Sequence, residues 1–355
     1  MNATGSQVHP TRFWRPLPQG LVECLVCPRR CRMAEGQRGF CSARGNVDGA
    51  VVLHGYGRSS GFAVDPIEKM PLFHFLPGTK VLSFGTSGCN LACGFCQTWT
   101  SSRAGGPEAL QASAGPDEIA GWARDLGCAG VAFTGNDPVI SHEYCVDTAQ
   151  ACRALGLRTV AVSAGYQNAG PRAEFYQYMD AANIDLKAFS DAFYRRLCGG
   201  RLRPVLETLQ YLARETRTSL ELTTLLIPGE NDSVRELEAL TRWIAGTLGP
   251  DVPLHFSAFH PAWKLMDIPP TPLASLLEAR RIALGNGLHH VYVGNMDCRA
   301  AESTYCHHCG RLLIRRGRHA PFAWNLTERG ACQGCGAVCP GVFMGRRSFA
   351  GPAVP

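Results

Sequence analysis

Residues 89–96 read Cys89-Asn-Leu-Ala-Cys93-Gly-Phe-Cys96, a C-x3-C-x2-C run in a predicted loop that follows the apolar segment 81–86. The three thiolates are compact enough to grip three corners of one iron–sulfur cluster. No fourth cysteine lies nearby in the sequence, and a [4Fe–4S] cube with three cysteine ligands keeps one iron open for an outside ligand. A zinc site would want a fourth protein ligand with pairwise spacing. This loop therefore predicts an iron–sulfur centre with an open coordination position.

Around this loop, residues 78–295 alternate short β-branched or apolar runs with helix-periodic stretches. Such alternation is typical of βα units around a parallel sheet. One helix is especially clear: S-V-R-E forms a capping box at Ser233, and Gly249-Pro250 ends the helix. We expect an α/β fold, a partial (β/α)6 TIM-like barrel. Its strand candidates are 81–86, 129–134, 158–163, 181–187, 219–227 and 253–259, with 291–295 as a candidate seventh.

Polar and glycine residues follow each predicted strand, where parallel βα folds bind their ligands. Asp185 and Lys187 end the fourth strand and, being two residues apart, face the same side of it. A charged pair on an inward face is either functional or a satisfied structural ion pair.

Two cysteine-rich flanks surround the predicted barrel. The first has the spacing C-x2-C-x3-C-x9-C, and four such thiolates close a metal site. The site could be structural zinc or an auxiliary iron–sulfur cluster, and spacing alone does not decide. Its four cysteines are Cys24, Cys27, Cys31 and Cys41.

The second flank has two C-x2-C knuckles, each followed by glycine, which is typical of a zinc ribbon. We expect a zinc-stapled module without chemistry of its own, because about fifty residues need such a staple. The four predicted zinc ligands are Cys306, Cys309, Cys332 and Cys335, with His307, His308 and Cys339 as spare donors.

The composition fits this division into modules. The chain has 355 residues, 45% of them apolar, and seventeen cysteines. No signal segment or membrane span is visible, so we expect a cytoplasmic protein whose thiols serve metals rather than disulfides. Both flanks are rich in arginine, but metal-bound thiolates offset part of that charge, and a nucleic-acid partner is not expected. The expected organisation is a flexible N-terminus 1–20, a metal module 21–77, the barrel 78–300, the zinc ribbon 301–345 and a tail 346–355.

The cysteine spacing, with an aromatic residue before the last cysteine, resembles that of the radical S-adenosylmethionine (SAM) superfamily. The resemblance implies that the open iron binds the amino and carboxylate groups of SAM. The reduced cluster then cleaves SAM to a 5′-deoxyadenosyl radical, which abstracts a hydrogen atom. The segment that receives the SAM ammonium corresponds to Gly135-Asn136-Asp137. The resemblance places Phe95 near adenine through its backbone and assigns Asn136, Asp137 and Lys187 to positioning SAM.

Longer stretches resemble the radical SAM member of the AmmeMemoRadiSam system, a group similar to the pyruvate formate-lyase activating enzymes. They are DPIEKMPLFHFLPGTKVLSFGTSGCNLACGFCQTW, NIDLKAFSDAFYRRLCGG, LLIPGENDS and LHFSAFHPAWKL. The resemblance assigns Asp185, Lys187 and His260 to the SAM site. Ser163-Ala164-Gly165-Tyr166 replaces the usual Ser-Asn-Gly-Tyr, with Ser163 as a cofactor contact. Gly135-Asn136-Asp137-Pro138 replaces Tyr-Asn-Glu-Pro, so substrate contacts are expected to differ.

Three functions remain open at this point. The chain could abstract hydrogen from a small metabolite, or it could install a glycyl radical on a partner protein as an activating enzyme does. A third alternative is a metal- and nucleic-acid-binding protein without catalysis. The resemblance implies a flavodoxin- or ferredoxin-type electron donor and Amme-domain and Memo-like partner proteins, and no membrane.

Overall fold

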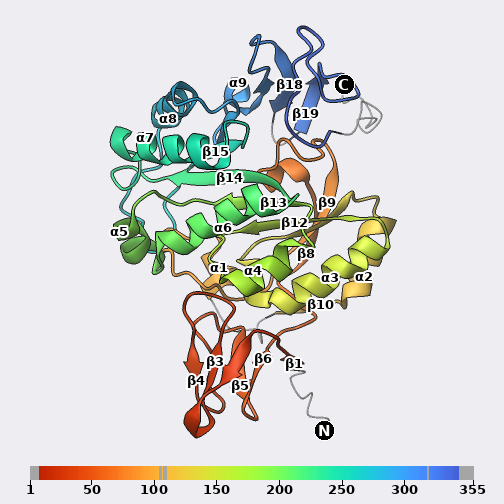
Figure 1. The fold of residues 1–355 in the computed structure, drawn as a ribbon, viewed down its shortest axis with the longest axis vertical. Helices are drawn as coiled ribbons and strands as arrows, with labels where there is room; N and C mark the ends of the chain where they lie inside the picture. Colours follow the sequence, from red (N-terminus) through yellow and green to blue (C-terminus); the bar gives the residue numbers. More distant parts are fainter. Residues whose placement is uncertain (1–7, 104–105, 107–109, 318–319, 344–355) are drawn as a thin grey trace.

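The computed structural model describes residues 8–103, 106, 110–317 and 320–343. Its centre is an eight-stranded sheet with the strand order β16-β15-β14-β13-β12-β11-β9-β8. Figure 1 shows this sheet in the middle of the molecule, with the N-terminal segment at one end of the long axis and the C-terminal segment at the other. The predicted tail 346–355 lies outside the described residues.

Seven strands of this sheet run parallel, each beside the next in the sequence. Every strand that the sequence predicts is present, including the candidate seventh, because short runs rich in valine, leucine, isoleucine and alanine alternate regularly with helices. The parallel strands are β9 (Lys80–Phe84), β11 (Gly130–Phe133), β12 (Arg158–Ser163), β13 (Ala181–Asp185), β14 (Ser219–Leu226), β15 (Leu254–Ala258) and β16 (Val291–Gly294).

Helices connect these strands, and Figure 1 shows α3, α4 and α6 in front of the sheet. The predicted cap is confirmed: Ser233 Oγ accepts a hydrogen bond from Glu236 N at 3.3 Å and starts α7. A π-helical turn, η6 (Ile244–Leu248), extends α7 to Gly249. The helices are α1 (Trp99–Arg103), α2 (Pro116–Asp125), α3 (His142–Ala154), α4 (Ala169–Tyr176), α5 (Asp191–Phe193), α6 (Leu202–Glu215), α7 (Val234–Trp243), α8 (Leu273–Gly285) and α9 (Arg299–Glu302), with shorter turns η1 (Pro18–Gly20), η2 (Ile67–Lys69), η4 (Pro138–Ser141) and η5 (Tyr194–Cys198).

The segment 62–76 belongs to the central sheet, although the sequence analysis assigned it to the N-terminal module. Strand β8 (Phe62–Pro66) pairs antiparallel with β9. The residues after it form a second apolar cluster with β9, β11, β12 and β13. Glu221 on β14 fixes this segment by accepting the backbone N–H groups of Phe73 at 3.0 Å and His74 at 2.7 Å. This segment therefore pairs and packs with the central sheet.

The N-terminal module consists of small antiparallel sheets of orders β1-β6-β5 and β2-β3-β4, and β7 pairs with β10. Residues 8–20 contribute to these sheets, because β1 pairs with β6 and β2 with β3. The strands are β1 (His9–Pro10), β2 (Trp14–Pro16), β3 (Val22–Cys24), β4 (Arg32–Met33), β5 (Arg44–Val47), β6 (Ala50–Leu53), β7 (Arg58–Ser59) and β10 (Ala112–Ser113).

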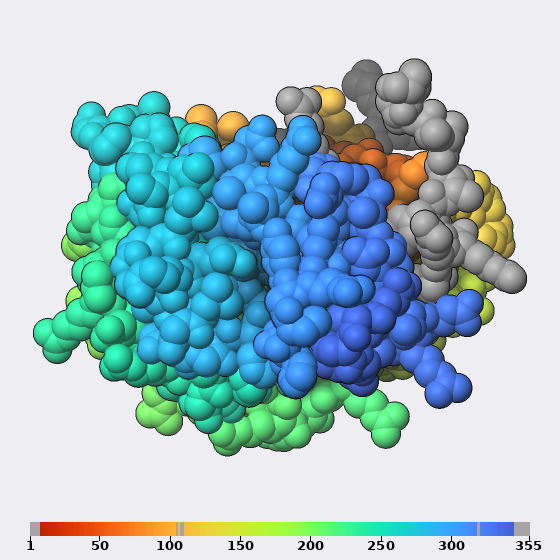
Figure 2. All heavy atoms as spheres, turned by 90° about the horizontal axis from the view of Figure 1, so that it is seen from above, coloured from red at the N-terminus to blue at the C-terminus, as the bar shows by residue number. Residues whose placement is uncertain are grey.

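The C-terminal module is an antiparallel sheet of β17 (Thr304–Tyr305), β18 (Leu312–Gly317) and β19 (Ala320–Trp324). Its small core combines Leu313, Ile314 and Leu326 with three of its cysteines. Figure 2 shows this module in blue, seated against the teal segment around α8. Among the described residues, no helix is long and apolar enough to cross a membrane.

Candidate active site

A cavity of about 330 Å³ lies at the carboxyl ends of the parallel strands, where the sequence placed the ligand-binding loops. The three cysteines of the loop 89–96 line it together with all but one of the other residues predicted for the SAM site. The lining residues used below are Cys89, Cys93, Phe95, Cys96, Asn136, Asp137, Ser163, Asp185, Lys187, Thr223, Leu225 and Ser257.

The cysteine loop is held by neighbouring backbone rather than by regular secondary structure. Ala92 N donates to Cys198 O at 2.7 Å, and Gly94 N donates to Leu197 O at 2.8 Å. From the other side, the Asn136 side chain accepts from Thr86 N at 2.9 Å and donates to Gly88 O at 3.0 Å. The Asn136 amide is therefore used to position the loop, which leaves backbone rather than this side chain to meet a ligand.

The N-terminal module touches the start of the same loop. Gly88 has φ +100°, and a Cβ there would overlap the Cys41 carbonyl oxygen. Arg29 donates to the carbonyl oxygen of Asn90 and, at 2.5 Å, to that of Gly199. The four-cysteine segment and the cavity loop are thus in direct backbone contact.

The three cavity thiols differ in their surroundings. Cys89 Sγ accepts a hydrogen bond from Leu91 N at 3.4 Å, and Cys96 Sγ lies 3.2 Å from Ser102 Oγ. Hydrogen bonding to the Cys198 thiol and burial raise the pKa of Cys93 well above its ordinary value. Cys198 stands alone in the sequence, and only the fold brings it beside a cavity thiol.

The predicted charged pair lies on the cavity side, with Asp185 at the end of β13 and Lys187 two residues beyond it. Lys187 Nζ donates to Asp185 Oδ2 at 2.8 Å. Burial opposes the charge on Lys187, but Asp185 and the Cys93 thiol outweigh burial and raise the pKa of Lys187 well above its ordinary value. The cavity wall therefore keeps a positive charge 5.9 Å from the centre of the Phe95 ring.

Asp137 is buried and joins two loops. Its Oδ1 accepts from Ser163 Oγ at 3.0 Å and Val139 N at 3.1 Å, and its Oδ2 accepts from Ala164 N at 3.1 Å. Burial raises the pKa of the Asp137 carboxyl, although these hydrogen bonds oppose the rise. Asp137, which is one methylene shorter than glutamate, therefore uses its carboxylate to position the loops at the cavity wall.

His260 is the predicted site residue that lies outside the cavity lining. Its ring is exposed, and Nε2 lies 3.3 Å from the Asn295 carbonyl oxygen. It follows the end of β15 by two residues and is not among the residues that line the cavity.

The sequence analysis missed the inward-facing residues of β14 and β15. Thr223 and Leu225 are two apart and share a face, and Ser257 on β15 pairs with Leu225, so alternation places them on one face. Thr223 Oγ1 is buried and makes no hydrogen bond to any part of the chain that the structure describes. A polar ligand would satisfy this hydroxyl, and three thiols beside a cationic wall fit a cluster with an anionic co-ligand.

Comparison with known proteins agrees with this arrangement. A sequence model of the radical SAM superfamily matches residues 84–243, which include the cysteine loop and the strands around the cavity. The chain contains a radical SAM domain. It is therefore an enzyme of the radical SAM class, a family that works with a [4Fe–4S] cluster and SAM.

Two relatives and one solved structure are similar to this chain. This radical SAM protein is 40% identical over 325 residues to uncharacterized protein MJ0808 of Methanocaldococcus jannaschii, covering 91% of this chain and 96% of the relative. It is 29% identical over 141 residues to the pyruvate formate-lyase-activating enzyme of Clostridium pasteurianum, 38% of this chain and 57% of that enzyme. A radical SAM methyltransferase structure from Sphaerobacter thermophilus aligns with TM-score 0.47 and 16% identity over 86% of this chain and 81% of that one. The predicted similarity to activating enzymes is confirmed.

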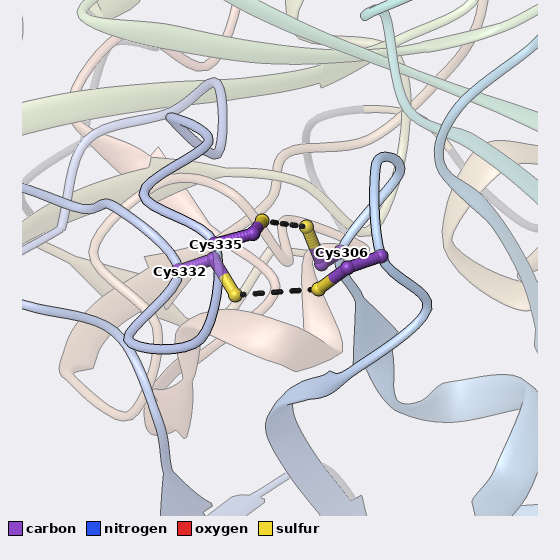
Figure 3. A group of neighbouring side chains, drawn as sticks. Cys306, Cys332 and Cys335 are labelled. Atoms are coloured by element: carbon purple, nitrogen blue, oxygen red, sulfur yellow. Dashed lines mark hydrogen bonds between the residues drawn. The ribbon is translucent and has the colours of Figure 1, made fainter.

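The C-terminal cysteines of this radical SAM protein converge as the ribbon pattern predicts (Figure 3). Cys306 Sγ lies 3.6 Å from Cys335 Sγ, and Cys309 Sγ lies 3.7 Å from Cys332 Sγ. All four sulfurs lie within 4.8 Å of one another. A tetrahedral zinc ion with Zn–S bonds of about 2.3 Å needs sulfurs about 3.8 Å apart, so the arrangement fits zinc.

The N-terminal cysteines surround one cavity together with Arg29, Arg44 and Asn90. Arg44 is buried and forms an ion pair with Glu143 at the start of α3. Burial opposes ionisation of Glu143, but Arg44 outweighs it and lowers the pKa of Glu143 to about 2. A charged contact between buried groups therefore fixes the module against the barrel.

Proposed function

We propose that this protein cleaves SAM reductively at a [4Fe–4S] cluster held by Cys89, Cys93 and Cys96, and uses the radical to abstract hydrogen from a substrate. The observation that carries the proposal is the convergence of three thiols from one loop on a cavity with an orphaned hydroxyl and a buried cation. The cluster with SAM supplies a one-electron cleavage that yields a 5′-deoxyadenosyl radical.

The chain's own residues would bind and orient SAM and exclude water from the cavity. Lys187 would hold an anionic group of SAM, and Thr223 Oγ1 would donate to or accept from a polar group. Asp185 keeps Lys187 in place, and Asp137 and Asn136 hold the loops from which backbone carbonyls meet the SAM ammonium. Phe95 closes the apolar side of the cavity, because its ring is buried against Phe193 at 5.8 Å between centroids.

The test is production of 5′-deoxyadenosine from SAM with dithionite by anaerobically purified, iron- and sulfide-reconstituted protein. Cys93→Ala should abolish it, whereas Cys152→Ala, which changes a buried thiol on α3 outside the cavity lining, should keep it. Wild-type protein with full iron content and no 5′-deoxyadenosine would refute the proposal.

The metal of the N-terminal module can be argued from sulfur spacing. Among the described cysteines, the C-terminal four lie within 4.8 Å of one another, but no three of Cys24, Cys27, Cys31 and Cys41 do. They still line a common cavity. In a [4Fe–4S] cube each thiolate ends on a different iron, so the sulfurs stand farther apart than on zinc. This spacing supports an auxiliary [4Fe–4S] cluster in the N-terminal module and zinc in the C-terminal one.

The order of the sheet supports a partial (β/α)6 barrel in which six consecutive strands enclose the cavity and β16 extends one edge. The same architecture supports three modules: residues 8–61, the barrel from β8 to about residue 300, and the zinc ribbon from about residue 301 to 343.

The substrate side of the proposal follows from the sequence. The long matching stretches support membership in the AmmeMemoRadiSam system, with Amme-domain and Memo-like proteins as partners and a flavodoxin or ferredoxin as the electron donor. Similarity to the Clostridium pasteurianum enzyme favours a second candidate function, installation of a glycyl radical on a partner protein.

One extract experiment separates the candidate substrates. If deuterium from labelled protein enters 5′-deoxyadenosine, the substrate is a macromolecule. Turnover with an extract stripped of macromolecules indicates a small metabolite instead.

A further inference from the structure

A second group of metal-ligand side chains lies between the barrel and the C-terminal module, apart from the four-cysteine site. It consists of His74 before β9, His290 before β16, and Cys339 after the second knuckle, which are 2%, 2% and 3% exposed. One ring nitrogen of each histidine and Cys339 Sγ all lie within 4.8 Å of one another. Three segments far apart in the sequence thus bring three donors to one buried point.

One donor of this group is unsatisfied. His290 Nε2 is buried and has no hydrogen-bond partner within residues 8–103, 106, 110–317 and 320–343. A buried nitrogen without a partner loses its hydration without compensation, which is destabilising. Such groups are uncommon in folded proteins and point to a ligand.

We propose that His74, His290 and Cys339 bind a second zinc ion, which fastens the C-terminal segment to the barrel. Two imidazoles and one thiolate are a borderline-soft donor set of the kind that zinc prefers, whereas Mg²⁺ and Ca²⁺ prefer oxygen. The Pro340 carbonyl oxygen, 2.6 Å from His74 Nδ1, or a water completes four-coordination.

The proton balance of binding is simple. His74 Nδ1 now contacts the Pro340 carbonyl, and Nε2 lies 2.6 Å from the Tyr292 hydroxyl. Binding zinc through Nδ1 places the ring proton on Nε2, which donates to Tyr292, and the Tyr292 hydroxyl lies 2.9 Å from Thr304 Oγ1. The Cys339 thiol proton leaves to solvent, so one proton is released for each zinc bound.

Existing contacts support a fastening role for this ion. Val342 N donates to His74 O at 2.7 Å, and Leu76 N donates to Val342 O at 2.7 Å. Burial lowers the pKa of His74 to about 3 and that of His290 to about 2, so both rings are neutral and able to bind metal near pH 7. The ion would add a cross-link to an interface that the backbone already defines.

The test counts zinc and iron by mass spectrometry in full-length protein that has been reconstituted, dialysed with zinc and freed of excess metal. Wild type should hold two zinc ions per chain, and His290→Ala should hold one with unchanged iron. His289→Ala is the matched control, because its ring pairs with Asp251 at 2.8 Å and lies outside the group. It should keep both ions.

The two zinc sites are distinguished by Cys309→Ser and by cobalt. Cys309→Ser should remove the four-thiolate site and its strong sulfur-to-cobalt charge-transfer absorption, whereas His290→Ala and Cys339→Ser should keep most of that absorption. One zinc per wild-type chain at saturating zinc with the full four-thiolate spectrum would refute the second site, and so would an unchanged zinc count in His290→Ala.

Discussion

The two terminal modules each gather four thiols, yet they present them differently. In the C-terminal module the sulfurs lie in pairs 3.6 and 3.7 Å apart, two of the cysteines are exposed, and none of the module's described residues lines the cavity of the barrel. In the N-terminal module the sulfurs stand farther apart, and the module touches the cavity loop through Gly88 and Arg29. Cysteine count alone therefore does not indicate function; spacing and contact with the active cavity do.

The largest expected effect comes from replacing one cysteine ligand in each terminal module. Cys27→Ser should remove about half of the iron and leave zinc unchanged, because the other cluster stays on its own loop. Cys309→Ser should remove one zinc and leave iron unchanged. Metal analysis of the reconstituted variants checks both, and zinc bound by the N-terminal module in wild type would overturn the contrast.

A second prediction concerns the contact of the N-terminal module with the barrel. Glu143→Ala leaves Arg44 buried without its counter-charge and should lower the free energy of unfolding by about 3–5 kcal/mol. Glu207→Ala removes an exposed pair with Arg203 on α6 and should cost about 0.3–0.5 kcal/mol. Urea denaturation measures the two, and equal effects would show that Arg44 finds water or another partner.

In metal-free protein, acid should weaken the interface of the C-terminal module with the barrel at a higher pH than the interface of the N-terminal module. His74 and His290 have folded pKa values of about 3 and about 2, below the ordinary 6.5, so their contribution is complete above pH 6.5 and is lost as pH falls toward 3. Glu143 has a folded pKa of about 2, below the ordinary 4.5, so its contribution is lost only between pH 4.5 and 2. At pH 5, protonation of each histidine should lower the free energy of unfolding by about 2 kcal/mol, whereas Glu143 should lower it little.

Limited proteolysis across this range should therefore cleave the C-terminal module first. Bound zinc should protect that module down to lower pH, because protons then compete with the metal. Simultaneous release of both modules at pH 5 would contradict the assignment of the two interfaces.

The smallest expected difference in stability is between substitutions of two exposed phenylalanines, one in each terminal module. The Arg29 guanidinium lies 3.4 Å from the centre of the Phe40 ring in the N-terminal module, so Phe40→Leu should cost about 0.5–1 kcal/mol. Phe322→Leu in the C-terminal module changes a side chain that is 60% exposed and should stay within about 0.5 kcal/mol of wild type. Thermal unfolding of both variants measures the difference.

The sequence was sufficient for features set by local pattern. The parallel strands and the cap at Ser233 follow from alternation and capping chemistry, and the loop 89–96 follows from cysteine spacing. Strand β8 was missed because its assignment depends on a long-range pairing with β9. The resemblance assigned His260 to the SAM site, whereas in the structure its exposed ring is not among the residues that line the cavity.

Contacts between distant segments were beyond the sequence. Nothing near Cys198 marks it as a neighbour of Cys93, and nothing joins His74 to Cys339 across more than 260 residues. Thr223 and Ser257 are intermediate cases, since alternation along their strands predicts a shared face but not which face lines the cavity.

The contact between Cys41 and Gly88 bears on the order in which the protein is made. The four N-terminal cysteines leave the ribosome before the barrel has folded. Glu143, the barrel residue that pairs with Arg44 of this module, follows Cys41 by about a hundred residues. At about 5–20 residues per second this interval lasts about 5–20 seconds. The proposed auxiliary cluster would be assembled in this interval, because docking of the module against the barrel afterwards encloses the four thiols.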